Sequence, residues 1–319
     1  MEKNYPKISV CILTHNSQET IVECLESVSK TDYPNFEIIV VDDNSKDKTI
    51  KIIKNFEKKI SIELIQINEK NTIGKLRNTA IKNSSGEFIA FTDSDCFVQK
   101  NWLKELIEGF KSGQTAGVGG KNLTPENDSV FQKSVGEFYS FFSFLGSNYV
   151  AKNSQMSETS HNPSCNVLYK KKALLAVNGF NESLASNEDP ELDARLRKNG
   201  YKLVFSPKAI VFHHRKKKLN EFFNQAIWYG MGRMQAMKKN IELTEWFRML
   251  PLVLNLILLA LLFFFFFWGI LMALLLLLGG MAFGLIVSAQ SSLKKPLTYF
   301  LLFIAWWMGY SIGMLKGIW

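Results

Sequence analysis

Short apolar runs alternate with amphipathic segments along the first part of the chain. The runs ISVCILT (8–14), FEIIVV (36–41), SIELIQI (61–67) and EFIAFT (87–92) have the length of buried strands. Between them lie QETIVECLESVSK, KTIKIIKNFEK and TIGKLRNTAIKNS, in which apolar residues recur at helical spacing. This strand–helix–strand rhythm predicts a mostly parallel sheet that is covered by helices on both faces.

The pattern becomes less regular beyond residue 115. CNVLY (165–169) predicts a strand, and NEDPELDARLRKNGY (187–201) predicts a helix. KLVF (202–205) and AIVFHH (209–214) predict two further short strands. LNEFFNQAIWYGMGRMQAM (219–237) gathers apolar residues on one side of a helix and has basic neighbours, a pattern typical of helices that lie in a membrane interface.

The C-terminal part has the hydropathy of membrane spans. Residues 251–290 contain no charged residue, and a transmembrane helix needs roughly 20 apolar residues. The sequence therefore predicts spans at about 251–268 and 270–290, and a third at about 297–316. Buried core helices are the alternative, but soluble cores rarely contain runs such as LLFFFFFW.

Three regions follow from this pattern. We expect an N-terminal domain over 1–235, an interfacial or juxtamembrane region over 217–248 and a membrane domain over 249–319. The N-terminus has no apolar signal-peptide core, so the first domain is expected to stay in the cytoplasm. Basic clusters at 215–218 and at Lys294–Lys295 agree with a multi-pass protein of the cell membrane in that orientation, because cytoplasmic loops are enriched in Lys and Arg.

The 319-residue chain has a formal net charge of +9. A basic protein can bind nucleic acid, but the positive charge concentrates beside the predicted spans, which favours a membrane surface and not nucleic acid as the partner. The four cysteines form no CxxC pair, which suits reduced thiols in a cytosolic domain and disfavours a zinc or disulfide framework.

Polar clusters occur where three of the predicted strands end. They are THN (14–16), DDNS (42–45) and DSD (93–95), and ligands of such sheets bind beyond the carboxyl ends of the strands. Asp93 and Asp95 repel each other, and a hard divalent cation held through their oxygens would offset that repulsion. DxD is also common in surface turns, so its position beside DDNS matters more than the motif alone.

DDNS permits three interpretations. It could be a plain turn, since Asp and Asn tolerate turn geometry. It could be a phosphoacceptor pocket of the receiver type, which the chain length and the membrane segments disfavour. It could also accept a hydrogen bond from the imide N–H of a uracil-like base.

Two further groups carry possible chemistry. Glu188 and Asp189 begin a predicted helix, where the dipole favours carboxylates, and one of them could act as a general base at a cleft edge. The alternative is a pair of ordinary helix-start acids. His213 and His214 end a predicted strand before a basic run, and could add an imidazole ligand to the DxD metal or form a membrane-proximal loop.

Taken in order, these segments resemble the inverting family 2 glycosyltransferases of the GT-A fold. The matching blocks are ILTHN, VVDDNSKDKT, NTIGKLRNTAIKNSSGEFIAFTDSD and SCNVLYKKKALLAVNGFNESLASNEDPELDARLRKNGYKLVFSPKAIVFHH, within about residues 7–233. The last block is especially similar to the succinoglycan-type, membrane-anchored branch. The resemblance implies an α/β nucleotide-diphospho-sugar transferase fold, with a Rossmann-like N-terminal half, followed by transmembrane helices.

The resemblance also implies roles for particular residues. Donor contacts fall on Thr14, Asn16, Asp42 or Asp43, Arg77 and Asp93; Mg²⁺ or Mn²⁺ ligands on Asp95, Asp93 and His213; the general base on Asp189 with Glu188 beside it; and the acceptor side on Asn166, Gln225 and Trp228. The family's usual Pro and Tyr around the first Thr are Leu13 and His15 here.

The implied reaction moves a sugar from a UDP- or GDP-linked donor to a lipid-linked saccharide, with inversion. Transfer to polyprenyl (dolichyl) phosphate and a non-catalytic nucleotide-sugar-binding membrane scaffold are the alternatives. Gln225-Ala-Ile-Trp228-Tyr lacks the Arg of the QxxRW motif, which argues against processive synthesis. The aromatic stretch 136–150 and the helix 219–237 could guide the lipid or serve core packing.

Overall fold

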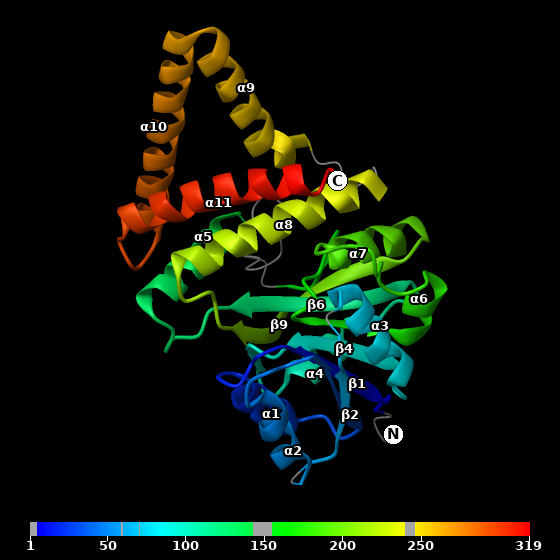
Figure 1. Cartoon of the computed structure of the whole chain (residues 1–319). Helices are drawn as coiled ribbons and strands as arrows, with labels where there is room; N and C mark the ends of the chain where they lie inside the picture. The colour runs from blue at the N-terminus through cyan, green and yellow to red at the C-terminus, as the bar shows by residue number, and fades with distance from the viewer. Residues whose placement is uncertain (1–4, 59, 70, 143–154, 240–245) are drawn as a thin grey trace. The chain divides into compact units, whose positions relative to one another are not determined.

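The computed structural model (Figure 1) describes residues 5–58, 60–69, 71–142, 155–239 and 246–319. The chain divides into two compact units, and each is described by itself. The sheet unit comprises Met1–Pro125, Ser143–Ser183 and Glu188–His214, and the helical unit comprises Glu126–Phe142, Leu184–Asn187 and Arg215–Trp319.

A mixed sheet forms the centre of the sheet unit (Figure 1). Its described strands are β1 (Ile8–Thr14), β2 (Phe36–Asp43), β3 (Ile62–Ile67), β4 (Phe88–Asp93), β5 (Cys96–Val98), β6 (Thr115–Leu123), β7 (Ser157–Thr159), β8 (Val167–Lys170) and β9 (Lys202–His213). The order is β3–β2–β1–β4–β8–β6–β9–β5, with β7 paired to β9. Strands β3, β2, β1 and β4 are parallel, as are β6 and β9, whereas β8 runs antiparallel to β4 and β6. The predicted α/β class is confirmed.

Helices cover both faces of this sheet. They are α1 (Ile21–Ser29), α2 (Thr49–Glu57), α3 (Ile73–Asn83), α4 (Trp102–Ile107), α6 (Lys171–Ala176) and α7 (Glu188–Lys198). Because side chains alternate along a strand, Val10 and Ile12 of β1 join a core cluster with Trp102 of α4, while Cys11 joins a second cluster with Leu76 of α3. The predicted coverage of both faces is therefore confirmed.

One strand differs from the prediction. KLVF and AIVFHH were expected to be separate, yet β9 runs continuously through both. The residues between the two predicted strands form a shift in register against β6: Gly120 pairs with Ser206, but Lys121 pairs with Ile210. Pro207 has no N–H for the ladder, so this segment bulges. A Cβ on Gly120 would lie 1.9 Å from the carbonyl oxygen of Ala209, so the bulge requires glycine there.

Glu37 links neighbouring segments at the end of the sheet that lies opposite the polar clusters. Its carboxylate accepts hydrogen bonds from Ser9 Oγ (2.5 Å) and from the backbone N and Oγ of Ser85 (2.7 and 2.6 Å), and it pairs with Lys7 Nζ at 2.7 Å. Partial burial opposes the charge, but these donors outweigh it and lower the pKa of Glu37 to about 2. The ionised carboxylate therefore stabilises the folded sheet.

Glu37→Gln is expected to reduce the free energy of unfolding by roughly 1–3 kcal/mol at pH 7. The folded-state pKa is depressed, so this contribution is present above the unfolded value of about 4.3 and is lost as the pH falls toward 2. Thermal melting of both proteins in detergent between pH 7 and pH 2.5 measures the effect. A stability difference that stays constant over this range would contradict the assignment.

The helical unit has its own apolar core. Its described helices are α5 (Val130–Phe142), α8 (Leu219–Lys239), a 3₁₀ turn (Trp246–Met249), α9 (Leu250–Phe264), α10 (Phe266–Gln290) and α11 (Pro296–Lys316). Phe138 of α5, Phe222 of α8, Val287 of α10 and Leu302 of α11 are buried against one another. The amphipathic helix predicted at 219–237 corresponds to α8.

Helices α8 and α11 lie side by side and parallel (Figure 1). Gly309 and Gly313 of α11 and Gly317 at its C-cap face the backbone of α8, and a Cβ on Gly313 would lie 2.0 Å from the carbonyl oxygen of Ile227. Small residues at four-residue spacing allow such close packing of two helices. One face of α8 is therefore covered by α11.

The C-terminal helices agree only in part with the predicted spans. Helices α10 and α11, of 25 and 21 residues, are long and apolar enough to cross a membrane, whereas α9 has 15 residues and falls short of the roughly 20 required. The break after α9 lies at Phe265, a few residues before the boundary expected between the spans 251–268 and 270–290. Residues 263–268 join α9 to α10, and each is at least 58% exposed.

Candidate active site

Three strands of the sheet unit bring a possible metal site together. Asp93 ends β4, and Asp95 directly precedes β5. Strand β5 pairs with β9 so that Cys96 lies opposite His213, which brings His213 Nε2 to 3.3 Å from Asp95 Oδ1. Ligand atoms of Asp93, Asp95 and Cys96 lie within 4.8 Å of one another, as do those of Cys96, Cys165 and His213.

The electrostatics of Asp93 suit a bound cation. Its side chain is 33% exposed, yet the protein atoms packed around the carboxyl group raise its pKa to about 7. Burial is the main cause, Cys165 and the Asp95 carboxylate add to the shift, and Arg77 opposes it. A divalent cation would remove this penalty, and two carboxylates with an imidazole fit Mg²⁺ or Mn²⁺.

The ends of β1 and β2 form a second polar edge. Thr14 lies opposite Asp42 in the parallel pairing, and its hydroxyl is buried with no hydrogen-bond partner among the described residues. Asn16 adopts a left-handed conformation (φ 49°), and its side-chain oxygen accepts a hydrogen bond from the backbone N of Lys46 at 2.8 Å.

The two acids of β2 differ in their contacts. Both oxygens of Asp42 accept hydrogen bonds from Ser45, from its backbone N at 2.9 Å and from its hydroxyl at 2.5 Å. Asp43 Oδ1 accepts from the backbone N of Asn71 at 3.0 Å. Oδ2 of Asp43 makes no hydrogen bond within the described part of the chain. Both oxygens of Asp42 therefore stabilise the loop after β2, whereas Oδ2 of Asp43 is available for a ligand.

Arg77 of α3 and Glu188 of α7 form a buried ion pair through Arg77 Nη1 and Glu188 Oε1. Their side chains are 6% and 5% exposed. The second guanidinium nitrogen, Nη2, lies 3.9 Å from Asp93 Oδ1. The guanidinium carbon lies over the ring of Phe180, 5.3 Å from the ring centroid. Burial raises the pKa of Glu188 and the Arg77 charge opposes the shift. Glu188 is thus committed to Arg77.

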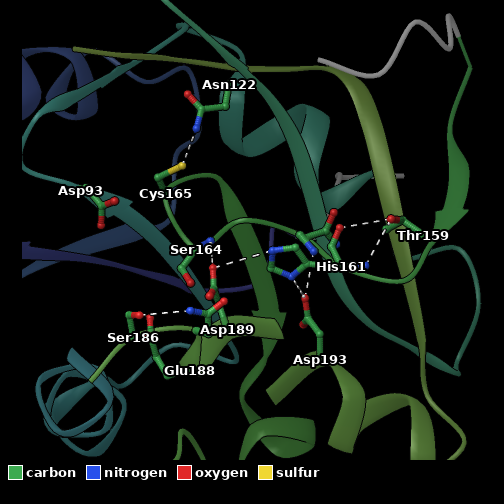
Figure 2. Close-up of polar contacts among 12 residues, drawn as sticks. Asp93, Asn122, Thr159, His161, Ser164, Cys165, Ser186, Glu188, Asp189 and Asp193 are labelled. Carbon is green, nitrogen blue, oxygen red and sulfur yellow. Dashed lines mark hydrogen bonds and ion pairs between the residues drawn. The ribbon is translucent and has the colours of Figure 1, made fainter. Parts of the chain in front are cut away.

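Asp189 has different surroundings (Figure 2). Its side chain is 21% exposed, Oδ2 accepts a hydrogen bond from the backbone N of Ser164 at 3.2 Å, and His161 Nε2 lies 3.9 Å from the same oxygen. No hydrogen bond reaches Oδ1 from the residues described. Of the two acids that start α7, Asp189 is the one with an oxygen available for a substrate.

Two of the three residues expected on the acceptor side, Asn166 and Gln225, make side-chain hydrogen bonds within the protein. Asn166 is fully buried, accepts from Trp102 Nε1 at 2.8 Å and donates to the carbonyls of Lys121 and Ala209. These bonds use its side-chain oxygen and nitrogen and link α4, β6 and β9, and the acceptor-side role of Asn166 stays a prediction. Gln225 and Trp228 lie on α8, where Gln225 Oε1 accepts from Tyr139 at 2.9 Å.

Sequence reasoning did not identify four residues of this site. Ser164 and His161 contact Asp189, Asp193 contacts His161, and Cys165 lies beside the possible metal ligands (Figure 2). The available signal was the polar run SHNPSCN at 160–166, which directly precedes β8. That run has no recognisable ligand spacing.

Comparison with known proteins identifies the family. The model described as "Glycosyl transferase family 2" matches residues 9–177. Over 244 residues, which cover 73% of this chain and 74% of the relative, the sequence is 31% identical to the dolichyl N-acetyl-alpha-D-glucosaminyl phosphate 3-beta-D-2,3-diacetamido-2,3-dideoxy-beta-D-glucuronosyltransferase of Methanococcus voltae.

Two solved structures have a similar fold. One is the mannosyltransferase PcManGT from Pyrobaculum calidifontis in complex with GDP-Man and Mn²⁺ (TM-score 0.68, 18% identity, 99% of this chain and 88% of that chain). The other is S. aureus TarS 1-349 in complex with UDP-GlcNAc (TM-score 0.53, 23% identity, 75% and 72%). The fold is that of the GT-A transferases, and the chain belongs to glycosyl transferase family 2.

Proposed function

We propose that the protein is a membrane-anchored, metal-dependent, inverting glycosyltransferase that extends a lipid-linked saccharide. Family membership supports sugar transfer. The observation that carries the mechanism is the contrast at the start of α7, where Glu188 is paired with Arg77 and Asp189 keeps a partly exposed carboxylate. A single carboxylate available for proton removal suits a one-step displacement.

The donor site is proposed at the ends of β1, β2 and β4. Asp43 would accept a hydrogen bond from the base, because Oδ1 and Oδ2 of Asp42 are both engaged by Ser45. The buried hydroxyl of Thr14 would gain a partner when the nucleotide binds, and Asn16 lies on the adjoining turn. Relatives in fold bind GDP-Man and UDP-GlcNAc, which supports a GDP- or UDP-linked donor.

The metal ligands are proposed to be Asp95, Asp93 and His213. Mg²⁺ or Mn²⁺ held by these residues would supply positive charge beside the leaving diphosphate. Arg77, close to Asp93 and buried against Glu188, would hold the Asp93 carboxylate in place and favour its charged form. The Mn²⁺ in the complex of PcManGT supports this choice of cation.

In the proposed reaction Asp189 takes the proton from an acceptor hydroxyl. The hydroxyl oxygen forms a bond to the anomeric carbon from the face opposite the nucleotide. The bond from that carbon to the diphosphate breaks, and its electron pair leaves with the nucleotide. One displacement inverts the anomeric centre. Glu188 contributes by positioning Arg77 and does not take the proton.

The acceptor class follows from the need for a base. A polyprenyl phosphate is already ionised near pH 7, so transfer to it needs no proton acceptor, whereas a sugar hydroxyl does. The setting of Asp189 therefore favours a saccharide hydroxyl over a free lipid phosphate. The M. voltae relative, whose name specifies a dolichyl N-acetylglucosaminyl phosphate, supports a lipid-linked sugar. Gln225 and Trp228 stay proposed acceptor-side residues on the resemblance alone.

Membrane anchoring is proposed through the C-terminal helices. Helices α10 and α11 could span, and the exposed Phe263–Trp268 stretch would contact lipid. The basic residues 215–218 and Lys294–Lys295 favour a multi-pass topology with the sheet unit on the cytoplasmic side.

A donor screen on detergent-solubilised protein tests the function. Nucleotide release would be followed with UDP- and GDP-sugars and Mn²⁺, with and without membrane lipid extract containing lipid-linked saccharides. Release that needs one donor and the lipid fraction is expected. Nucleotide binding without release from any donor would favour the scaffold alternative.

Asp95→Ala is expected to raise the Mn²⁺ concentration for half-maximal activity at least tenfold, because even groups that only orient ligands contribute roughly 10–100-fold to metal affinity. Mn²⁺ titration of activity, with EDTA-treated wild type as reference, measures this. Glu37→Gln is the matched control, since Glu37 lies at the opposite end of the strands. An unchanged Mn²⁺ requirement in Asp95→Ala would rule out Asp95 as a ligand.

A further inference from the structure

Asp189, His161 and Asp193 form a row of three side chains (Figure 2). His161 lies between two acids of α7: its Nδ1 is 2.8 Å from Asp193 Oδ2, and its Nε2 is 3.9 Å from Asp189 Oδ2. His161 precedes β8 in the polar run 160–166, so the row joins two segments that are distant in the sequence. None of the functional assignments above uses His161 or Asp193.

Asp193 is held as a hydrogen-bond acceptor. It is fully buried, and its oxygens face Tyr169 Oη at 2.7 Å, the backbone N of Asn162 at 2.9 Å and His161 Nδ1. Burial, with the Asp193 carboxylate adding to it, raises the pKa of the Tyr169 phenol well above its ordinary value, so this hydroxyl keeps its proton and donates. Three donors around a buried carboxylate suit its ionised form.

This arrangement fixes the tautomer of His161. An ionised carboxylate can only accept, so Nδ1 carries a proton and donates to Asp193. In neutral His161 the lone pair is then on Nε2, which faces Asp189. Asp193 and Asp189 on α7 are titratable groups that face His161, and Tyr169 on β8 contacts the far side of Asp193.

We propose that His161 accepts, at Nε2, the proton that Asp189 removes from the acceptor hydroxyl. The proton moves from the hydroxyl to Asp189 as the glycosidic bond forms, and then from Asp189 to Nε2, which leaves Asp189 ionised and His161 positively charged between two carboxylates. The 3.9 Å separation closes by a small side-chain rotation or through one water. The His161 side chain is 19% exposed, which gives the proton a way to solvent.

The benefit is a stronger base than a carboxylate alone. A carboxylic acid has a reference pKa of about 4 and an imidazole of about 6.5, so a proton that ends on imidazole is held more firmly. General-base catalysis becomes more effective as the base strength approaches the operating pH. Because His161 acts through Asp189 and touches no substrate, it is a positioning residue. The proposal rests on the proposed function, in which Asp189 is the base.

His161→Gln tests the proposal in the full-length protein. We expect kcat to fall about tenfold or more, with the KM for the donor unchanged. The acid limb of kcat against pH should move to lower pH, because a lone carboxylate loses its proton at lower pH than an imidazole. Added imidazole should restore part of the lost rate, which a purely structural role would not allow. Saturating Mn²⁺ is used throughout.

Glu191→Gln is the matched control, because Glu191 is a buried carboxylate of the same helix that pairs with Arg195 at 2.8 Å. This variant should keep the wild-type pH profile and show no response to imidazole. A His161→Gln protein with the wild-type kcat and pH profile, or with a loss that imidazole does not relieve, would overturn the proposal. If Asp189→Asn is inactive while His161→Gln is normal, only the relay fails; if Asp189→Asn is fully active, the proposed base itself fails.

Discussion

Asp189→Asn is expected to lower kcat roughly 10²–10⁴-fold, the range attributed to general-base catalysis, and to leave donor binding intact. The amide has the shape of the carboxylate, and its oxygen can still accept from the backbone N of Ser164. It cannot take a proton from an acceptor hydroxyl. Turnover measured by nucleotide release, together with calorimetric titration of the nucleotide sugar and Mn²⁺, separates the two effects.

Glu188→Gln is the informative neighbour for comparison. It removes the charge that faces buried Arg77, so it should lower the melting temperature, whereas Asp189→Asn should melt like wild type. An Asp189→Asn protein that transfers sugar at the wild-type rate would contradict the proposed base. That result would favour an ionised phosphate as the acceptor, since such an acceptor needs no proton removal.

The hydrophobic pattern predicted most of the sheet unit because its signals are local. Strands β1, β2 and β4 lie where apolar runs end in polar clusters, and parallel pairing aligns those ends, as the Thr14–Asp42 register illustrates. The continuity of β9 was missed, because Pro207 interrupts the run in sequence while a shift in register bridges it in space. The close pairing of α8 with α11 depends on glycines of a different segment, which a helical pattern alone does not reveal.

Prediction was less complete at the candidate site. Asp93, Asp95 and His213 were expected together; the β5–β9 pairing places His213 beside Asp95, and Asp93 lies beside Asp95 at the end of β4. The pattern could not separate Asp42 from Asp43, because the difference depends on hydrogen bonds from Ser45 and Asn71. The sequence pattern also does not reveal that the Asn166 side chain is hydrogen-bonded to Trp102 and to the carbonyls of Lys121 and Ala209.

Some predictions were left untested. The stretch 136–150, expected either to guide the lipid or to serve core packing, lies within the described residues only as far as 142, in α5. The succinoglycan-type branch, the domain boundaries and the membrane topology stay predictions.

Arg77→Met is expected to lower the free energy of unfolding by about 3–5 kcal/mol, the range for removing one partner of a buried ion pair. The Glu188 carboxylate, whose side chain is 5% exposed, would then be buried without an opposite charge beside it. The double variant Arg77→Met/Glu188→Met should regain most of this loss, because a buried pair replaced by apolar groups is often neutral or stabilising. Denaturant unfolding of the wild type and the variants measures the cycle.

Activity should not follow stability in this cycle. Arg77 lowers the pKa of Asp93, so its removal in the refolded double variant shifts that pKa upward and leaves less of the carboxylate ionised near pH 7. The Mn²⁺ requirement of the double variant should therefore rise, and raising the pH from 7 to about 8.5 should relieve it, because the proton competing with the metal is removed. A double variant that is stable and has the wild-type Mn²⁺ requirement would mean that Arg77 serves packing alone. A raised Mn²⁺ requirement that alkaline pH relieves would mean that Arg77 keeps the Asp93 carboxylate ionised for the cation. The buried Arg77–Glu188 pair would then contribute to metal binding and not only to packing.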